Sequence, residues 1–281
     1  MGYLKATFDE VVVSHAARTA EAVEAPPARP DVILNLVSSR SRALLADIEA
    51  KARALGVSVS PPAEGSWRTE DKRTYLEDFP DVSPPTLIAR EFDEVRAAWQ
   101  RFGGDVVVKD PMGDRGQGVE RVRVEADLEI VRTMLASTIC GTGELIVQPY
   151  MSGFAKGDKR IVLQRMPDNS FEIIAYFFRQ PPVGGWKSNI RNGGISLPTR
   201  LTDAEAAFAL DLAPRAGVDN VGLDVAEHDG RLYYIEHNQG YGGIIDFDLH
   251  WGVRSVRHCA AFLWHIARHG RPDVAVSFAA K

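Results

Sequence analysis

The sequence predicts an α+β protein built mainly on antiparallel sheets. Three observations predict this fold class. Residues 158–178 and 221–238 are each predicted to form a β-hairpin, and residues 105–124 two strands joined by a glycine-rich loop. Strands that come in such runs, with helices between the runs, are typical of α+β proteins. The 281 residues suffice for one large domain or two small ones.

Composition narrows the class of protein. The hydrophobic fraction of 45% and the charged fraction of 25% are those of a soluble globular protein. The net charge of −5 argues against a nucleic-acid partner. Cys140 and Cys259 make no disulfide framework, and no apolar run is long enough to span a membrane. We therefore expect a cytoplasmic protein without a membrane or nucleic-acid partner.

The first 65 residues predict a short α/β domain. Residues 1–30 are rich in Ala, Glu and Pro and are expected to be partly flexible. Residues 31–37 form an apolar run of strand length, residues 41–56 have helical spacing, and residues 57–59 suit a second strand. This β-α-β pattern is too short for a complete nucleotide-binding domain.

The next stretch centres on the glycine-rich loop Gly113–Gly118. Helices are predicted at residues 70–76 and 91–102, and strands at 105–110 and 119–124 flank the loop. A Walker A loop or a dinucleotide fingerprint needs a helix after the glycines, so both are disfavoured here. A glycine-rich hairpin can still cover phosphates with its backbone N–H groups; the alternative is an ordinary flexible turn.

The remaining elements alternate helices with strands. They are a helix at 127–137, a strand at 144–150, the hairpin 158–165 and 171–178, a helix that opens with the capping box Thr202–Glu205 and runs to about Gly217, and a last helix at about 254–269. A long loop, residues 180–198, separates the first hairpin from the helix that follows. Loops of this length are usually functional or disordered.

The hairpin at residues 221–238 turns at Asp229-Gly230 and carries three side chains with oxygen donors. Glu236 and Asn238 share one strand face, and Tyr233, Ile235 and His237 are assigned to the other, with His237 as a packing residue. Asp224 joins Glu236 and Asn238 only if the loop has an odd number of residues, which a three-residue loop would supply. Two carboxylates and an amide suit a hard cation such as Mg²⁺; the alternative is a polar outer face.

Several motifs follow one another in a distinctive order. They are Lys72, Lys109 at the end of a valine strand, the glycine-rich loop, Val147-Gln-Pro-Tyr150, Gly157-Asp-Lys-Arg160, Lys187–Gly194, Gly222-Leu-Asp224 and Ile235-Glu-His-Asn238. This order resembles the ATP-grasp superfamily, and within it the bacterial glutathione synthetase and ribosomal-protein S6 glutamate ligase branch, over about residues 60–265. The resemblance implies two α+β lobes with ATP between antiparallel sheets: a central lobe at 66–150 and a C-terminal, metal-binding lobe at 151–281, after the short α/β domain at 1–65.

The resemblance implies a role for each matching residue. Lys72 and Lys109 match the lysines that hold the ATP phosphates. The other implied ATP contacts are Gly113, Arg115, Gly116, Gln117 and Gly118 in the loop, Gln148, Pro149, Tyr150 and Met151 at the adenine hinge, and Asp158 near the ribose. Asp224, Glu236 and Asn238 match the ligands of Mg²⁺, with two ions expected and Mn²⁺ as an alternative metal.

The reaction implied by the resemblance joins a carboxylate to an amine through an acyl phosphate, releasing ADP and phosphate. Arg160, Lys187, Asn189 and Arg191 form its reaction end; for the residues of the loop, the alternative is that they only keep it soluble. Gln239–Gly243 departs from the Ser-Pro-Gly type of turn in related ligases, so the substrates, small molecules or peptides, stay open. A phosphotransferase and a catalytically silent nucleotide-binding module are the alternative functions, and a homodimer is an expectation from the family.

Overall fold

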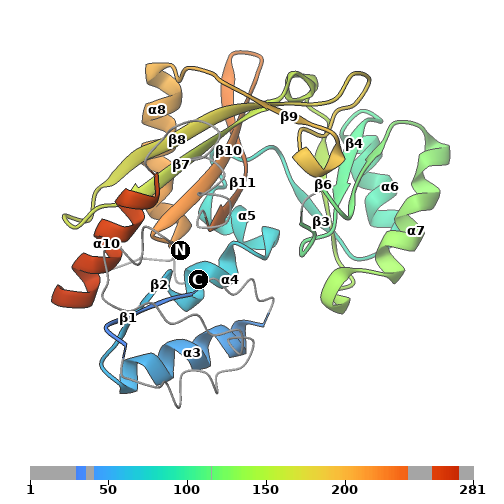
Figure 1. Ribbon diagram of the computed structural model, residues 1–281. Coiled ribbons are helices and arrows are strands. Elements are labelled where there is room, and N and C mark those ends of the chain that lie inside the picture. The colour runs from blue at the N-terminus through green and yellow to red at the C-terminus, as the bar shows by residue number, and fades with distance from the viewer. Residues whose placement is uncertain (1–29, 36–40, 115, 240–254, 272–281) are drawn as a thin grey trace.

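Three β-sheets from three successive stretches of the chain make up the fold (Figure 1). The computed structural model describes residues 30–35, 41–114, 116–239 and 255–271. One sheet has two parallel strands, one has four antiparallel strands in the order β3-β6-β4-β5, and one has five in the order β11-β10-β7-β8-β9. The predicted α+β class is confirmed. The domain boundaries at residues 65 and 150 stay predictions.

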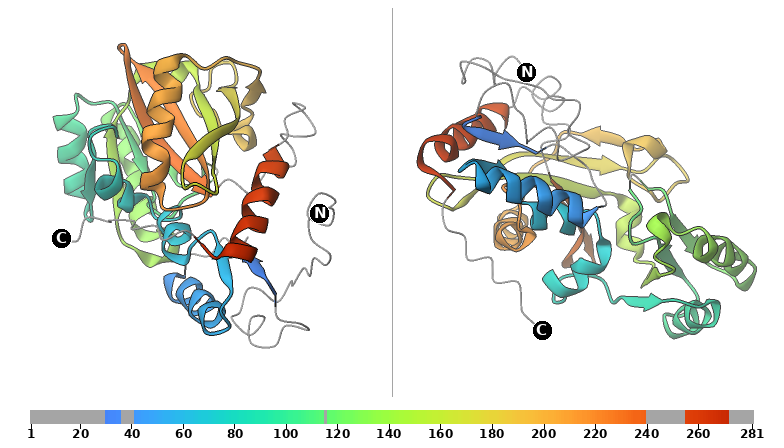
Figure 2. Two further views of the ribbon diagram at one scale, coloured as in Figure 1. Left: turned by 90° about the vertical axis from the view of Figure 1, so that its left-hand side faces the viewer. Right: turned by 90° about the horizontal axis from the view of Figure 1, so that it is seen from below.

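The two-stranded sheet belongs to a small unit that both ends of the described chain complete. Strands β1 (Val32–Leu34) and β2 (Ser58–Ser60) flank helix α3 (Arg42–Ala54), as the β-α-β pattern predicts. Helix α10 (Ser255–His269) packs its buried Phe262 and Ile266 against β1. Figure 2 shows α10, in red, beside the blue β1 strand in both views. The last described helix therefore covers the first described strand.

The four-stranded sheet has one face for its core and one for the site. Its strands are β3 (Leu87–Ala89), β4 (Val106–Lys109), β5 (Val119–Val122) and β6 (Leu145–Pro149), and helices α6 (Phe92–Arg101) and α7 (Glu129–Ala136) lie on its outer side (Figure 1). Val106, Val108 and Val147 pack into the core beneath these helices. Because side chains alternate along a strand, Lys109 and Gln148 belong to the opposite face.

The five-stranded sheet is organised in the same way. Its strands are β7 (Asp158–Arg165), β8 (Phe171–Gln180), β9 (Ile195–Leu197), β10 (Asn220–His228) and β11 (Arg231–Gln239). Helix α8 (Asp203–Leu212) and residues Tyr75 and Phe79 cover the core face of β7, β10 and β11. The predicted capping box of α8 is present, with Thr202 Oγ1 accepting from Glu205 N at 3.2 Å.

The hairpin of β10 and β11 corrects one prediction. Its loop has two residues, Asp229 and Gly230, with φ of 50° and 76°, and His228 pairs directly with Arg231. Positive φ at both positions is what a primed two-residue turn requires. The expected three-residue loop is therefore wrong. A β-bulge places Asp224 on the same face as Glu236 instead. The register jumps from Val225–Tyr234 to Asp224–Glu236 and leaves Ile235 as the extra residue.

The bulge also changes which residues face the core. Tyr234, and not Tyr233, joins His237 on the buried side, where Tyr234 Oη and His237 Nδ1 lie 2.6 Å apart. The packing role of His237 is confirmed, because its side chain is 1% exposed. Burial lowers the pKa of His237 to about 3, so the imidazole is neutral.

Two other predicted segments differ from their expected structure. Residues 70–76 do not form one helix. Helix α4 (Ala63–Arg68) precedes them, and a 3₁₀ turn (Lys72–Thr74) leads into α5 (Tyr75–Asp78). The long loop after β8 holds β9 and a 3₁₀ turn (Ile190–Asn192). Further 3₁₀ turns are Glu125–Leu128, Ile139–Gly141, Ser152–Lys156 and Ala213–Ala216.

Within the described ranges, no helix has the length and apolar character needed to cross a bilayer. Arg115 and residues 240–254 lie outside the described residues.

Candidate active site

A pocket lies between the site face of the four-stranded sheet and strand β11. Its lining residues are Lys72, Tyr75, Leu76, Ser83, Thr86, Lys109, Ile146, Gln148 and Ile235. Lys109 and Gln148 enter it from β4 and β6, and Ile235 enters it from the bulge of β11. The pocket thereby brings together three residues that are far apart in the sequence and are predicted to contact the nucleotide: Lys72, Lys109 and Gln148.

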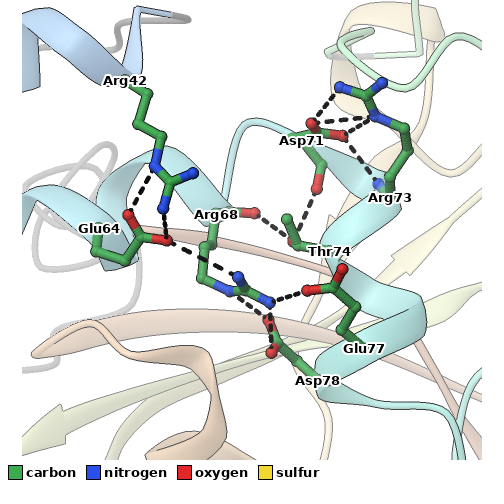
Figure 3. A network of polar contacts seen from close by, with 8 residues as sticks. All are labelled: Arg42, Glu64, Arg68, Asp71, Arg73, Thr74, Glu77 and Asp78. Carbon is green, nitrogen blue, oxygen red and sulfur yellow. Dashed lines mark hydrogen bonds and ion pairs between the residues drawn. The ribbon is translucent and has the colours of Figure 1, made fainter. Parts of the chain in front are cut away.

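Local hydrogen bonds fix the segment that carries Lys72 (Figure 3). The Asp71 carboxylate accepts from the backbone N–H of Arg73 at 3.0 Å and so caps the 3₁₀ turn. The Arg73 guanidinium also donates to Glu144 at 2.5 Å, which ties the turn to the start of β6. Lys72 itself donates to the carbonyl of Gly113, and its Nζ lies 4.0 Å from Glu236 Oε2. The ammonium therefore touches both the glycine-rich loop and the predicted metal site.

Lys109 lies in an unusual electrostatic setting. Burial of the side chain lowers its pKa to about 8; the nearby charge of Lys72 acts in the same direction, and Glu236 opposes both. Below about pH 8 the side chain is an ammonium that can meet a phosphate, and above it the side chain becomes neutral.

Because the sequence predicts that Lys109 contacts a phosphate of the nucleotide, the affinity for a nucleotide should follow the titration of Lys109. A bound phosphate stabilises the ammonium and raises its pKa, so the Kd for MgADP should rise about tenfold per pH unit from pH 8 upward, until the pH reaches the higher pKa of the bound state. Calorimetry between about pH 7 and about pH 9.5 measures this slope. In Lys109→Arg, whose guanidinium stays charged, the slope should vanish. An equal slope in both proteins would contradict the assignment.

A row of polar side chains crosses three strands of the five-stranded sheet. Arg160 on β7 pairs directly with Asp224 on β10, and Asp224 pairs directly with Glu236 on β11. Directly opposite residues of antiparallel strands share a face, so the three side chains project together. Asn238, two residues beyond Glu236, lies opposite Gly222. A Cβ on Gly222 would lie 3.1 Å from Cδ of Arg160, so the glycine leaves room for the guanidinium.

Asp224 is the buried centre of this row. It is 0% exposed and accepts two hydrogen bonds from Arg160. Arg179 Nη2 lies 2.5 Å from its Oδ2. Desolvation opposes ionisation, but the two guanidinium groups prevail and hold the pKa of Asp224 below its ordinary value. The carboxylate is therefore charged and oriented by two arginines.

Arg179 is a residue of the site that was not predicted from the sequence. Its buried guanidinium bridges Asp224 and Asp158, with Nε donating to Asp158 Oδ1 at 2.6 Å. The pairing of β7 with β8 could have revealed Arg179, because the register of this hairpin places Arg179 opposite Asp158. The predicted strand ended at residue 178, one residue too early to include it. Arg179 thereby adds a second cation beside Arg160.

Asp158 is placed differently from its predicted role near the ribose. Its carboxylate is 6% exposed and accepts from Arg179 and from the Ser188 hydroxyl. Both oxygens are thus engaged within the protein, and Asp158 does not line the pocket that holds the two lysines. Burial raises its pKa above the ordinary value, against the attraction of Arg179. The geometry indicates that Asp158 orients the guanidinium of Arg179.

The glycine-rich loop touches the long loop of the other lobe. Gly113 N and Gly118 O both bond to the backbone of Asp110, which closes the loop at its base. Gly116, with φ of 78°, leaves no room for a Cβ against the side chains of Asn189 and Asn192. Lys187 Nζ lies 3.5 Å from the Gly116 carbonyl and 3.7 Å from Glu120. The two loops therefore meet over the space between the sheets, beside Gln117.

The other predicted residues occupy the edges of this space. Met151 is buried, and the Tyr150 ring, next to Pro149, packs under the Arg121 guanidinium at 3.2 Å and against Trp186. Arg191 is exposed on its 3₁₀ turn. The structure thus brings Lys187 and Asn189 into contact with the described part of the glycine-rich loop, and no such contact is formed there by Arg191.

The oxygen donors on β10 and β11 match the chemistry of a hard cation. Within the described ranges, no group of three or more His, Cys, Asp or Glu side chains is arranged to hold a metal ion. The predicted set instead combines two carboxylates with the amide of Asn238, and all three lie on one face of the hairpin. Carboxylate and amide oxygens suit Mg²⁺, which commonly takes few protein ligands. Glu236 and Asn238 fit that ion, whereas the carboxylate of Asp224 is buried and both of its oxygens are engaged by Arg160 and Arg179.

Two antiparallel sheets with a cationic pocket between them define a class of protein, the ATP-grasp fold. Solved structures share this arrangement. The RimK domain protein ATP-grasp from Sphaerobacter thermophilus has a TM-score of 0.60 at 16% identity, covering 83% of this chain and 80% of that one. D-alanyl-alanine synthetase A from Vibrio cholerae has a TM-score of 0.56 at 14% identity, covering 74% and 67%. These likenesses concern the fold alone.

The family follows from the sequence match. Residues 72–235 match the family model "Prokaryotic glutathione synthetase, ATP-grasp domain". The chain belongs to that family, and the predicted superfamily and branch are confirmed. The glutathione synthetase of Bordetella parapertussis is 31% identical over 163 residues, which are 56% of this chain and 49% of that protein. That of Rhodopseudomonas palustris is 28% identical over 220 residues, covering 77% and 60%. The chain spans about half the length of the curated relatives it matches.

Proposed function

We propose that this protein is an ATP-dependent carboxylate–amine ligase that forms an amide bond and releases ADP and phosphate. One observation carries the proposal. Lys72 stands at the junction of the pocket and the polar row, touching the glycine-rich loop and lying 4.0 Å from Glu236. The lysines of the pocket, the acidic groups of β10 and β11 and two arginines therefore lie next to one another. The family and the ligase names of the relatives support the same chemistry.

The nucleotide end of the site is assigned to the pocket. Lys72 and Lys109 neutralise phosphate oxygens as compact charges, and the backbone of residues 113–118 covers them. Gln148 and the hinge residues that follow it bound the adenine, where apolar walls and a few polar groups suffice. Glu236 and Asn238 would hold Mg²⁺, and the buried carboxylate of Asp224 beside them orients the two arginines. When bound, the ion supplies positive charge against the phosphate oxygens.

The reacting end is assigned to the arginines and the long loop. Arg160 presents a guanidinium group that suits a carboxylate or a transferred phosphate, and Asp224, itself held by the buried Arg179, keeps it in place. Lys187 and Asn189 lie where the loop closes on Gly116, so they bring donors to the same space and exclude water from it. The residues orient two anions and cancel their repulsion; they form no covalent bond themselves.

A substrate screen tests the reaction. Amino acids and short peptides, offered as pairs of a carboxylate and an amine, should give ADP release that needs both partners, and mass spectrometry should show the amide. Hydroxylamine in place of the amine should give a hydroxamate, which reports an acyl phosphate. A stable phosphoester formed with a hydroxyl compound would instead identify a phosphotransferase. ADP binding without turnover across the whole screen would support a silent nucleotide-binding module.

A further inference from the structure

One side chain of the pocket, Gln148, is held in a single orientation by a neighbour outside the predicted motifs. Thr86 immediately precedes β3, and the register Leu87–Val147 continues outward to place Thr86 beside Gln148. Gln148 Nε2 lies 2.8 Å from Thr86 Oγ1. Thr86 Oγ1 in turn lies 2.7 Å from the carbonyl of Pro84. Thr86 and Gln148 both line the pocket.

The direction of these hydrogen bonds follows from the number of hydrogens. A threonine hydroxyl has one hydrogen, and a carbonyl oxygen can only accept, so Thr86 donates to Pro84. Thr86 Oγ1 can then only accept from Gln148, which must turn its NH₂ group toward it. The other end of the amide, Oε1, is left as an acceptor. Across the described residues, no donor reaches it.

We infer that Thr86 is a specificity-determining residue for the nucleobase, an inference that rests on the proposed function. By fixing the amide, Thr86 keeps an acceptor on the pocket side of Gln148. An acceptor there favours a base whose edge carries an amino group and disfavours one whose edge carries a carbonyl, because two acceptors facing each other leave both unpaired. The ligand class selected is the 6-aminopurine nucleotides, against the 6-oxopurine nucleotides.

The test compares MgADP with MgIDP, which carries a carbonyl and a neighbouring N–H at the edge where adenine carries its amino group. Calorimetry gives the two Kd values for the wild type and for Thr86→Val, which keeps the β-branched shape and removes the hydroxyl. The wild type should bind ADP at least about tenfold more tightly than IDP. In Thr86→Val the amide can rotate, and this ratio should fall about fivefold. Thr133→Val, at an exposed position of α7, is the matched control and should leave the ratio unchanged.

A second pair of variants keeps the test decisive if Thr86→Val does not fold. Gln148→Glu, which offers only acceptors, should keep the preference for ADP, and Gln148→Leu, which offers none, should lose it. An ADP/IDP ratio that is the same in Thr86→Val as in the wild type would overturn the inference and leave the ligase proposal standing. Folded wild-type protein that binds neither nucleotide would overturn the proposed function itself.

Discussion

Glu236→Gln should lower ATP turnover at least about 100-fold while the protein stays folded. Glu236 is the acidic group of the polar row that faces the lysine pocket, with its Oε2 4.0 Å from Lys72 Nζ. The amide keeps the shape of the side chain but removes the negative charge that a divalent ion needs. The Glu236 side chain is 25% exposed and glutamine occupies the same space, so we expect the variant to stay folded. ADP release with an active substrate pair measures the loss.

A matched variant separates this effect from general damage to the hairpin. Glu227 is exposed on the neighbouring strand β10, opposite Leu232, and Glu227→Gln should keep wild-type turnover. The Mg²⁺ concentration for half-maximal turnover should rise in Glu236→Gln and stay constant in Glu227→Gln. Turnover within about threefold of the wild type in Glu236→Gln would remove Glu236 from the metal site.

Arg179→Met should destabilise the fold by about 3–5 kcal/mol, because it leaves a buried carboxylate without its cation. Asp158 is 6% exposed, and the Arg179 guanidinium is its charged partner, so the charge of Asp158 would be left uncompensated. Asp224 would lose one of its two guanidinium groups and keep the bidentate contact of Arg160. The midpoint of thermal unfolding should fall by roughly 10 °C.

Two further variants assign this loss to the ion pair. Adding Asp158→Asn to Arg179→Met removes the orphaned charge and should recover part of the stability, which a double-mutant cycle quantifies. Arg101→Met, at an exposed position near the end of α6, should change stability by less than about 0.5 kcal/mol. Strictly additive losses for Arg179 and Asp158 would show that the two side chains do not act as a pair.

Local patterns in the sequence sufficed for most elements and for part of the site. The alternation in residues 231–239 places Glu236 and Asn238 on one face, and the spacing of Thr202 and Glu205 fixes the start of α8. The hairpin of β7 and β8 followed from two apolar runs around a turn. These features depend on residues a few positions apart, so period and turn chemistry reveal them. The short turns around Lys72 escaped prediction because contacts with distant residues, such as that of Arg73 with Glu144, shape them.

The chain order of lysines, glycine-rich loop and acidic hairpin was enough to indicate the family and the candidate ligands. Only the folded structure decided which of these side chains meet. The bulge at Ile235 turns Asp224 toward Glu236, the register of β8 on β7 sets Arg179 against Asp158, and the edge of β3 brings Thr86 to Gln148. Each of these contacts depends on how two strands align, and that alignment is set by the packing of the whole sheet, which no short stretch of sequence encodes.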